Sequence, residues 1–377
     1  MTIKVAIIGH SSELAGAELS LLFCVKRMVA QGFQVHVLLP KQGPLSQKIV
    51  ELKSDVNIHY LPLRWWMGKR QRYVIGAIRT VQSLWDTFGV LILLRKLRPQ
   101  VAVTISSVTP APLIASKILG IPNILTLGES LNSNPTLKSF LPKKFITWLI
   151  DKCTFRVLAC SRYVSNQYAL PSEIAYPEIE EFLVSAPSER NLAAPKIVML
   201  GSYSYEKGQN LAVEIALRLF EKGFKFSLDF YGWGDSKFLA ELERKVMEHG
   251  LISVVTFKSH TNDAYSVFRQ AAFTFVLSKN EAFGKVTLES LSQGTPVIGL
   301  DAGGTSEILE QGGGIIVEPD PVQIAQRIMK LCSSSEDYKE MQLSAVSNPI
   351  LYQIVGTRRD ICSHVFEAAS SNKIEGN

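Results

Sequence analysis

The chain has 377 residues, of which 46% are apolar and 20% are charged, a balance typical of folded proteins with buried cores. This length exceeds that of a typical single domain and predicts two domains. The net charge of +6 is uneven, because residues 1–182 hold 21 basic and 11 acidic side chains and the remainder hold 19 and 23. A basic first half favours an anionic partner such as a membrane surface, a phosphate-bearing substrate or a nucleic acid; scattered solvated lysines are the alternative.

The five cysteines are odd in number and form no CxxC pair, which argues against a disulfide framework and against a zinc site. They are Cys24, Cys153, Cys160, Cys332 and Cys362. The first residues show no secretory pattern, and no uninterrupted apolar run reaches the roughly 18 residues that a spanning helix needs. We therefore expect a cytoplasmic protein.

Short β-branched apolar runs alternate with longer stretches of helical period along the whole chain. This alternation predicts an α/β fold in which helices cover both faces of parallel sheets. The first set of predicted strands is 4–9, 35–40, 101–106, 123–128 and 157–161. The second set is 196–201, 227–232, 254–259, 273–278, 295–301 and 314–319.

A segment rich in Pro, Ser and Ala separates the two sets and reads as a linker. We predict an N-terminal Rossmann-like domain over 1–180, a linker over 181–195 and a second Rossmann-like domain over 196–345. Residues 346–377 are expected to form a helix that crosses back to the first domain, followed by a frayed tail. Ligands of such sheets bind at the carboxyl ends of the strands, so we expect the functional residues in the loops there.

The first of these loops reads GHSSELAGAELSLL and follows the strand predicted at 4–9. The GxGxxG fingerprint of dinucleotide-binding proteins is absent, because Gly9 is followed by His10 and Ser11. Gly16 lies between two alanines, where backbone N–H groups at a helix start can approach an anion. A tight turn without a ligand is the alternative.

Residues 64–98 combine eight basic residues with one acid, Asp86, and three of the five tryptophans. Apolar residues recur there at helical spacing, namely Val74, Ile78, Val81, Leu84, Trp85 and Phe88. A basic amphipathic helix with tryptophans can lie in a bilayer interface. We therefore expect a peripheral contact with the inner face of the membrane, or an acceptor surface, formed by Trp65, Trp66, Arg70, Arg72, Arg79 and Trp85.

The alternative for residues 64–98 is that the apolar stripe packs on the first sheet and only the arginines face water. Nucleic acid is not expected as a partner, because no recognition-helix, RNP or zinc-finger pattern accompanies the charge.

The second domain opens with KIVMLGSYSYEKGQNL, in which a strand ends at Gly201 and Lys207 precedes the next helix. A lysine beside a helix N-terminus opposes the helix dipole unless an anion binds there too. Lys207 is therefore a candidate phosphate ligand, with a solvated lysine as the alternative.

Residues 281–299, EAFGKVTLESLSQGTPVIG, join one predicted strand to the next. Gly284, Lys285 and Val286 form the first turn of a helix, whose unpaired N–H groups suit a diphosphate. Glu289 lies four residues after Lys285 on the same helix face and can accept hydrogen bonds from the two hydroxyls of a ribose. An exposed Lys–Glu surface pair is the alternative.

The pattern E-x-F-G-(K/R)-V-x-x-E, followed by GTPVI and AGGTSE, resembles the signature of the retaining, two-domain GT-B glycosyltransferases of family 4. The resemblance extends to EKG at 206–208, YGWGD at 231–235 and LAGAE near the N-terminus. It implies a GT-B fold, in which two Rossmann-like domains face each other across a cleft. It also implies a nucleoside diphosphate sugar as donor and a carbohydrate or lipid-linked acceptor.

Transferred to this chain, the resemblance assigns the donor ribose to Glu289, the transferred sugar to Glu281 and the diphosphate to the backbone of Phe283, Gly284, Lys285 and Val286. Lys207 would neutralise the diphosphate as the bond breaks. Gly16 and Ser202 complete the predicted donor site. Attack from the same face would retain the anomeric configuration, with the leaving phosphate taking the acceptor proton, so no carboxylate pair at glycosidase spacing is needed.

Two positions depart from the family pattern. Ser202 stands where the family usually has an arginine, and Gly128 and Glu129 stand where a strand end often carries a histidine. No DxD motif appears near a strand end, so we expect no metal cofactor. A non-catalytic GT-B subunit, and an epimerase or phosphorylase on the same scaffold, are the alternative functions.

Overall fold

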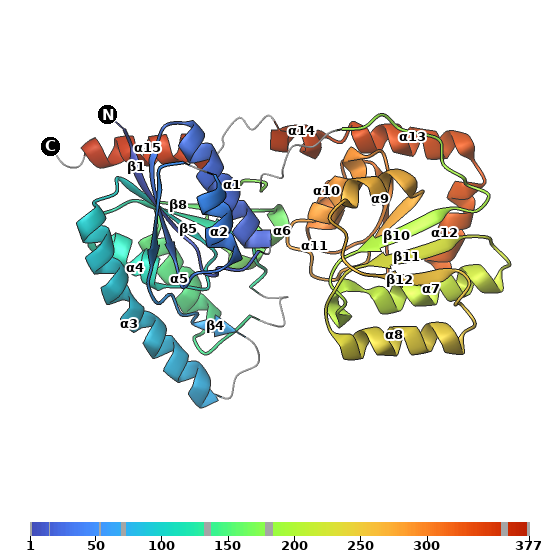
Figure 1. The fold of residues 1–377 in the computed structure, drawn as a ribbon, viewed down its shortest axis with the longest axis horizontal. Helices are drawn as coiled ribbons and strands as arrows, with labels where there is room; N and C mark the ends of the chain where they lie inside the picture. The colour runs from blue at the N-terminus through green and yellow to red at the C-terminus, as the bar shows by residue number, and fades with distance from the viewer. Residues whose placement is uncertain are drawn as a thin grey trace. The chain divides into compact units, whose positions relative to one another are not determined.

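The computed structural model describes residues 2–14, 16–52, 54–68, 73–131, 137–177, 184–355 and 361–374. The chain divides into two compact units, one made of residues 1–180 with 357–377 and one made of residues 181–356. Each unit contains one parallel sheet between layers of helices (Figure 1).

The first unit is built on a seven-stranded sheet of order β3-β2-β1-β5-β6-β8-β9, in which every pairing is parallel. Its strands are β1 (Lys4–Ile8), β2 (Gln34–Leu39), β3 (Val56–Tyr60), β5 (Val101–Ile105), β6 (Asn123–Leu127), β8 (Arg156–Ala159) and β9 (Glu173–Ile174). Its helices are α1 (Gly16–Ala30), α2 (Pro44–Glu51), α3 (Tyr73–Leu97), α4 (Ala111–Ile118), α5 (Lys143–Cys153), α6 (Arg162–Tyr168) and α15 (Ile361–Ile374). The short strands β4 (Met67–Gly68) and β7 (Lys138–Ser139) form a separate antiparallel ribbon.

The central strands are apolar at nearly every position because both faces of the sheet are covered. Val5 and Ile7 of β1 pack with residues of α1, whereas Ala6 and Ile8 pack on the other face with residues of α3 and α4. Successive side chains of a strand alternate between its two faces, so one short strand contributes to both halves of the core.

The C-terminal helix α15 packs on the first unit, although it follows the second unit in sequence. Val365 and its neighbours join the same core cluster as β1 and α1. Arg156 of β8 binds Glu367 through two hydrogen bonds of 2.7 and 2.9 Å. The first unit is therefore completed by residues from both ends of the chain.

The second unit is built on a six-stranded sheet of order β12-β11-β10-β13-β14-β15, also parallel throughout. Its strands are β10 (Lys196–Leu200), β11 (Ser227–Tyr231), β12 (Val255–Lys258), β13 (Phe273–Val276), β14 (Val297–Leu300) and β15 (Gly314–Val317). Its helices are the 3-10 turn η1 (Tyr205–Lys207), α7 (Gln209–Glu221), α8 (Ser236–Glu248), α9 (Ala264–Gln270), α10 (Lys285–Ser292), α11 (Gly303–Leu309), α12 (Pro321–Cys332), α13 (Ser335–Val346) and α14 (Pro349–Val355).

Each strand run predicted from the sequence contains a strand, but the edge strands β3 and β9 were not predicted. Within the described residues, one helix segment, Ile75–Leu97 of α3, is long and apolar enough by composition to cross a membrane, although a third of its most apolar window is buried. Its sequence is not an uninterrupted apolar run, because Arg79 and Asp86 break it.

Candidate functional site

The second unit has its topological switch point between β10 and β13, where the strand order reverses. The loops that follow these two adjacent parallel strands leave from the same edge of the sheet. Loops that diverge at such a point leave a crevice in which open α/β sheets bind ligands. The loops are residues 201–208 after β10 and 277–284 after β13.

Gly208 allows the loop after β10 to pack closely against the loop after β13. Its φ of 84° lies in the left-handed region, and an added Cβ would come within 2.2 Å of the carbonyl oxygen of Leu277. Only glycine combines this conformation with so close an approach. The contact brings Lys207 to the end of β13.

Lys207 and Glu281, the two predicted catalytic residues, form an ion pair across these loops. Lys207 Nζ lies 2.8 Å from Glu281 Oε2, and the side chains are 35% and 21% exposed. Next to them, Asn280 Nδ2 donates to Glu206 Oε2 at 3.1 Å. Lys207 is therefore held by a partner and is not an isolated solvated lysine.

The turn before α10 is shaped by glycines from two loops. Gly284 caps α10 with a φ of 99°. Gly303 and Gly304 at the start of α11 lie against this turn, and added Cβ atoms would come within 2.2 Å of the carbonyl oxygens of Glu281 and Phe283. Gly304 N–H also donates to the Glu281 carbonyl at 2.7 Å. The glycines of the AGGTSE segment thus support the turn, a role that the sequence analysis did not assign.

Glu289 lies on α10 behind this turn, 3.4 Å from Lys285 Nζ. Its side chain is only 14% exposed, whereas that of Lys285 is 44% exposed. Burial raises the pKa of the Glu289 carboxyl, and the charge of Lys285 offsets part of that rise. The pair is not the exposed surface pair offered as the alternative, because its acid is mostly buried.

The remaining predicted donor-binding residues lie in different units. Ser202 follows β10, and its carbonyl accepts a hydrogen bond of 2.9 Å from the side chain of Gln209. Gly16 begins α1 in the first unit, where an added Cβ would meet nothing within 4 Å.

The first unit has its own switch point between β1 and β5, and a partly buried polar network lies beside it. Glu129, at the end of β6, accepts hydrogen bonds from both hydroxyls of Ser106 and Ser107, at 2.8 Å each, and from the N–H of Ser107 at 2.6 Å. The Ser107 hydroxyl also lies 2.8 Å from the phenol of Tyr168, whose pKa is raised well above its ordinary value by burial.

Ser106 adopts a φ of 77°, a conformation that non-glycine residues rarely hold and that clusters at functional sites. From the sequence, Glu129 was noted only as a departure from a family pattern. The sequence signal for Glu129 was its position in LTLGES, directly after a predicted strand. The two serines that bind Glu129 follow the preceding strand, so the sequence did not link them to it.

The predicted membrane or acceptor surface is partly wrong. Trp66 is 1% exposed and donates from its indole to the Ser107 carbonyl at 2.9 Å, so it belongs to the core. Trp65 is 37% exposed and donates to the His10 carbonyl, while Trp85 is 66% exposed. Arg79 is exposed. Arg70 and Arg72 lie outside the described residues, as does the side chain of Val74.

The alternative, in which the apolar stripe of this helix packs on the sheet, is also wrong for the residues described. Ile78, Val81, Leu84, Trp85 and Phe88 are all exposed.

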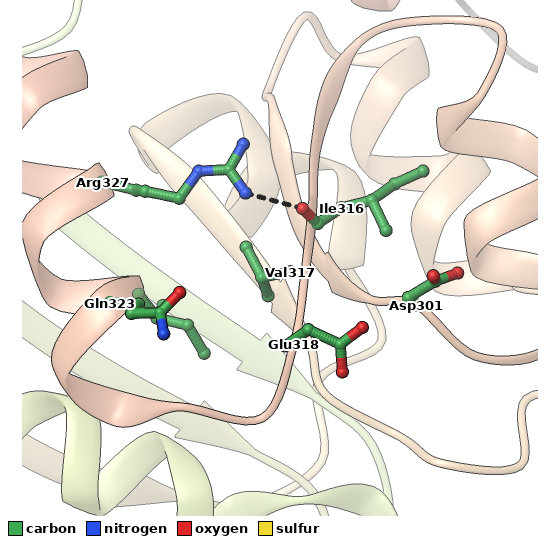
Figure 2. Close-up of a pocket in the computed structure, with 7 residues that line it drawn as sticks. Asp301, Ile316, Val317, Glu318, Gln323 and Arg327 are labelled. Atoms are coloured by element: carbon green, nitrogen blue, oxygen red, sulfur yellow. Dashed lines mark hydrogen bonds between the residues drawn. The ribbon is translucent and has the colours of Figure 1, made fainter.

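A pocket of about 180 Å³ lies elsewhere in the second unit, between β15 and α12 (Figure 2). It is lined by Asp301, Ile316, Val317, Glu318, Gln323, Ile324 and Arg327. Arg327 closes one side by donating to the Ile316 carbonyl at 2.7 Å. Because β15 is the edge strand, this pocket is separate from the switch point, and no predicted site residue lines it. In the described part of the chain, no group of three or more His, Cys, Asp or Glu residues is arranged to hold a metal ion.

Two Rossmann-like units in one chain fit a GT-B fold, and comparison with solved structures confirms this predicted fold class. HepE from Anabaena, crystallised in complex with UDP and glucose, superposes with a TM-score of 0.74 at 16% identity, over 98% of this chain and 100% of that one.

Sequence relatives support a GT-B glycosyltransferase. Residues 184–345 match the family of glycosyl transferases group 1. The chain is 25% identical over 294 residues to an uncharacterized glycosyltransferase of Methanocaldococcus jannaschii, covering 75% of this chain and 77% of the relative. It is 23% identical over 333 residues to one of the subunits of human phosphatidylinositol N-acetylglucosaminyltransferase, covering 84% of this chain and 65% of the relative.

Proposed function

We propose that this chain is a retaining glycosyltransferase of family 4 that moves a hexose or related sugar from a nucleoside diphosphate donor to a carbohydrate or lipid-linked acceptor. The observation that carries the proposal is the Lys207–Glu281 pair, which joins the two switch-point loops directly before α10. The relatives add support, since two are glycosyltransferases by name and HepE was crystallised with UDP and glucose. We assign the reaction to cell-surface polysaccharide or glycolipid synthesis.

The donor's charged part would be bound by the first turn of α10. N–H groups at a helix N-terminus attract phosphate oxygens, and the backbone of residues 283–286 supplies them. Lys207 would neutralise the diphosphate as negative charge develops on the leaving group. An incoming diphosphate competes with Glu281 for the same ammonium, which frees the Glu281 carboxylate for the hydroxyls of the transferred sugar.

The donor's ribose would be bound by Glu289. A carboxylate has acceptor capacity for two neighbouring hydroxyls, and its mostly buried position strengthens such hydrogen bonds. Same-face attack, with the leaving phosphate accepting the acceptor proton, needs no second protein carboxylate.

The acceptor would bind at the carboxyl edge of the first unit. Glu129 is fixed there by Ser106 and Ser107, and its Oε2 accepts a hydrogen bond of 3.2 Å from the Gly128 N–H. A fixed carboxylate with acceptor capacity left can orient a sugar hydroxyl.

A second candidate function is a non-catalytic GT-B subunit that binds a nucleotide or a partner glycosyltransferase. The observation that favours it is Ser202, which contributes no positive charge to the diphosphate site. Losing one cation beside a diphosphate removes roughly 2–4 kcal/mol of transition-state stabilisation.

Nucleotide binding tests the donor site. Glu289→Ala is expected to weaken binding of UDP, GDP or ADP by about 10- to 100-fold, since a hydrogen bond to a charged group contributes roughly 1.5–3 kcal/mol. Glu281→Gln is expected to leave nucleotide binding intact and to lower turnover. Glu214→Ala, an exposed acid on α7, is the matched control. The measurement is thermal stabilisation by each nucleotide.

The absence of stabilisation by any of the three nucleotides at millimolar concentration would overturn the donor assignment. Nucleotide binding without sugar transfer or donor hydrolysis, across a screen of acceptors, would favour the non-catalytic role.

A further inference from the structure

Residues 78–92 of α3 show the reverse of the pattern expected for a surface helix, because most of their apolar side chains face water. Five apolar residues, Ile78, Val81, Trp85, Phe88 and Ile92, are each 51–68% exposed, and we call them the α3 stripe. Their spacing of three and four residues places them along one face of the helix. Trp85 and Phe88 touch, with ring centroids 5.3 Å apart. Figure 1 shows α3 along the outside of the first unit.

The opposite face of α3, which meets the protein, is polar. It buries Thr80, Ser83, Asp86 and Thr87. The Thr80 hydroxyl donates to the Gly76 carbonyl at 2.9 Å, and the Ser83 hydroxyl donates to the Thr80 carbonyl at 2.8 Å. Polar groups are normally buried only where hydrogen bonds compensate them, so an apolar face left in water beside a polar face turned inward is unusual.

The rotation of α3 is fixed by specific contacts. Asp86 accepts a hydrogen bond of 2.7 Å from the Arg64 N–H and forms an ion pair of 2.9 Å with its guanidinium. Val90 and Leu94 pack into the core cluster on the sheet. The helix therefore cannot roll to hide the α3 stripe without breaking both sets of contacts.

A second exposed aromatic pair lies on the same layer of the first unit. Phe145 and Trp148 of α5 are 42% and 53% exposed, with ring centroids 5.6 Å apart. α3 and α5 both pack against α4. The segments that precede them pair as the β4–β7 ribbon, with Met67 opposite Ser139. Lys144 and Arg79, the sequence neighbours of Phe145 and Ile78, are exposed as well.

Charge and topology identify the occupant of this surface. The first half of the chain carries an excess of basic residues, 21 against 11, which complements anionic lipid headgroups. In a coiled coil, charged residues on either side of the apolar stripe would select the partner helix. Gln82 and Gly89, which lie at such positions, are uncharged and give no such selection. Strands β3 and β5, which flank α3, belong to one sheet, so α3 lies along a bilayer and does not cross it.

We propose that the α3 stripe, together with Phe145 and Trp148, docks the first unit on an anionic lipid bilayer and thereby selects a membrane-borne acceptor. The ribbon that precedes both helices lies at the acceptor edge, because the Trp66 N–H donates to the carbonyl of Val108, just after β5. Docking therefore brings the Glu129 network to the lipid surface. The choice of acceptor rests on the proposed function, whereas bilayer docking does not.

Vesicle flotation tests the docking surface. The full chain is expected to float with phosphatidylcholine vesicles containing about one third phosphatidylglycerol, and about ten-fold less with phosphatidylcholine alone. Trp85→Ser/Phe88→Ser is expected to reduce flotation about ten-fold, because its two side chains no longer enter the interface. Met247→Ser/Ile252→Ser removes two equally exposed apolar residues of the second unit and should float like the wild type.

Both double variants are expected to fold, because all four substituted side chains are exposed, and thermal unfolding checks this. Equal flotation of both double variants, or no flotation of the wild type, overturns the proposal. Light scattering tests the alternative that the stripe binds a second copy of the chain. A dimer in the wild type that is lost in Trp85→Ser/Phe88→Ser, together with no vesicle binding, also overturns the proposal and assigns the stripe to that second copy.

Nucleotide binding, which needs no vesicles, distinguishes a failure of the proposed function from a failure of bilayer docking. For the acceptor, Trp85→Ser/Phe88→Ser is expected to slow sugar transfer to vesicle-borne acceptors about ten-fold and to leave donor hydrolysis unchanged. Equal loss of transfer to soluble and vesicle-borne acceptors would overturn the selection of a membrane-borne acceptor.

Discussion

Glu289 is a residue whose charge lowers the stability of the unliganded fold while it is proposed to favour nucleotide binding. Its carboxyl is mostly buried, its pKa is raised by burial, and Lys285 compensates its charge only at 3.4 Å. An acid with a raised pKa binds its proton more tightly in the folded state. The free energy of unfolding therefore falls as pH rises from the ordinary value of 4.5 through the raised pKa, and it stays lower above it.

Glu289→Gln is expected to raise the melting temperature of the unliganded protein at neutral pH by about 2 °C and to flatten its dependence on pH in that window. The same change should reduce stabilisation by nucleotide, since the carboxylate is lost. Thermal shift across a pH series, with and without nucleotide, measures both effects. Glu243→Gln, at an exposed position of α8, is the control. A lower melting temperature with an unchanged nucleotide shift would contradict this account.

At the scale of elements, α15 shows that sequence order and spatial order differ. The helix fills the core of the first unit with Cys362, Val365 and Ala368, and Arg156 holds its outer side through Glu367. Its contribution to stability should therefore be confined to the first unit.

Val365→Ala is expected to destabilise the first unit by about 2 kcal/mol, because it removes fully buried methyl groups and leaves a cavity. Hydrogen exchange of β1 and β5 should accelerate, while exchange of β10 and β13 stays unchanged. Ser370→Ala, at an exposed position of the same helix, should leave both units unaffected. Faster exchange in β10 would show that the helix stabilises the second unit instead.

At the scale of the whole molecule, the proposed donor and acceptor groups are divided between two folding units. The ion pair, the α10 turn and Glu289 all lie in residues 181–356, whereas Glu129 and the α3 stripe lie in the other unit. Each unit places its polar loops at its own switch point, so each sheet can be responsible for one substrate.

A nucleoside diphosphate alone is therefore expected to slow hydrogen exchange in residues 201–208 and 281–289, roughly ten-fold or more at saturation, with little change in β1, β5 and β6. Mass-spectrometric hydrogen exchange with and without UDP provides the measurement. Protection centred on the loops after β1 and β5 would instead assign the nucleotide to the first unit.

Much of this architecture was predictable from sequence because parallel strands buried on both faces are continuous apolar runs. VAVTI at 101–105 and FTFV at 273–276 are such runs. The edge strand β3, VNIHY, was missed because it is only partly buried and alternates polar with apolar residues. The helix start in the EAFGKVTLE segment was also predictable, because a glycine before a stretch of helical period indicates a helix start.

The sequence by itself determined which residues carry charge, where the buried central strands run and that a helix start lies between Glu281 and Glu289. Only the tertiary structure decided that Lys207 meets Glu281 from 74 residues away, that Ser106 and Ser107 hold Glu129, and that Trp66 is core. It also decided the direction of the α3 stripe. Helical spacing shows which side chains share a face, but only the packing of the sheet, α4 and Arg64 determines which face meets water.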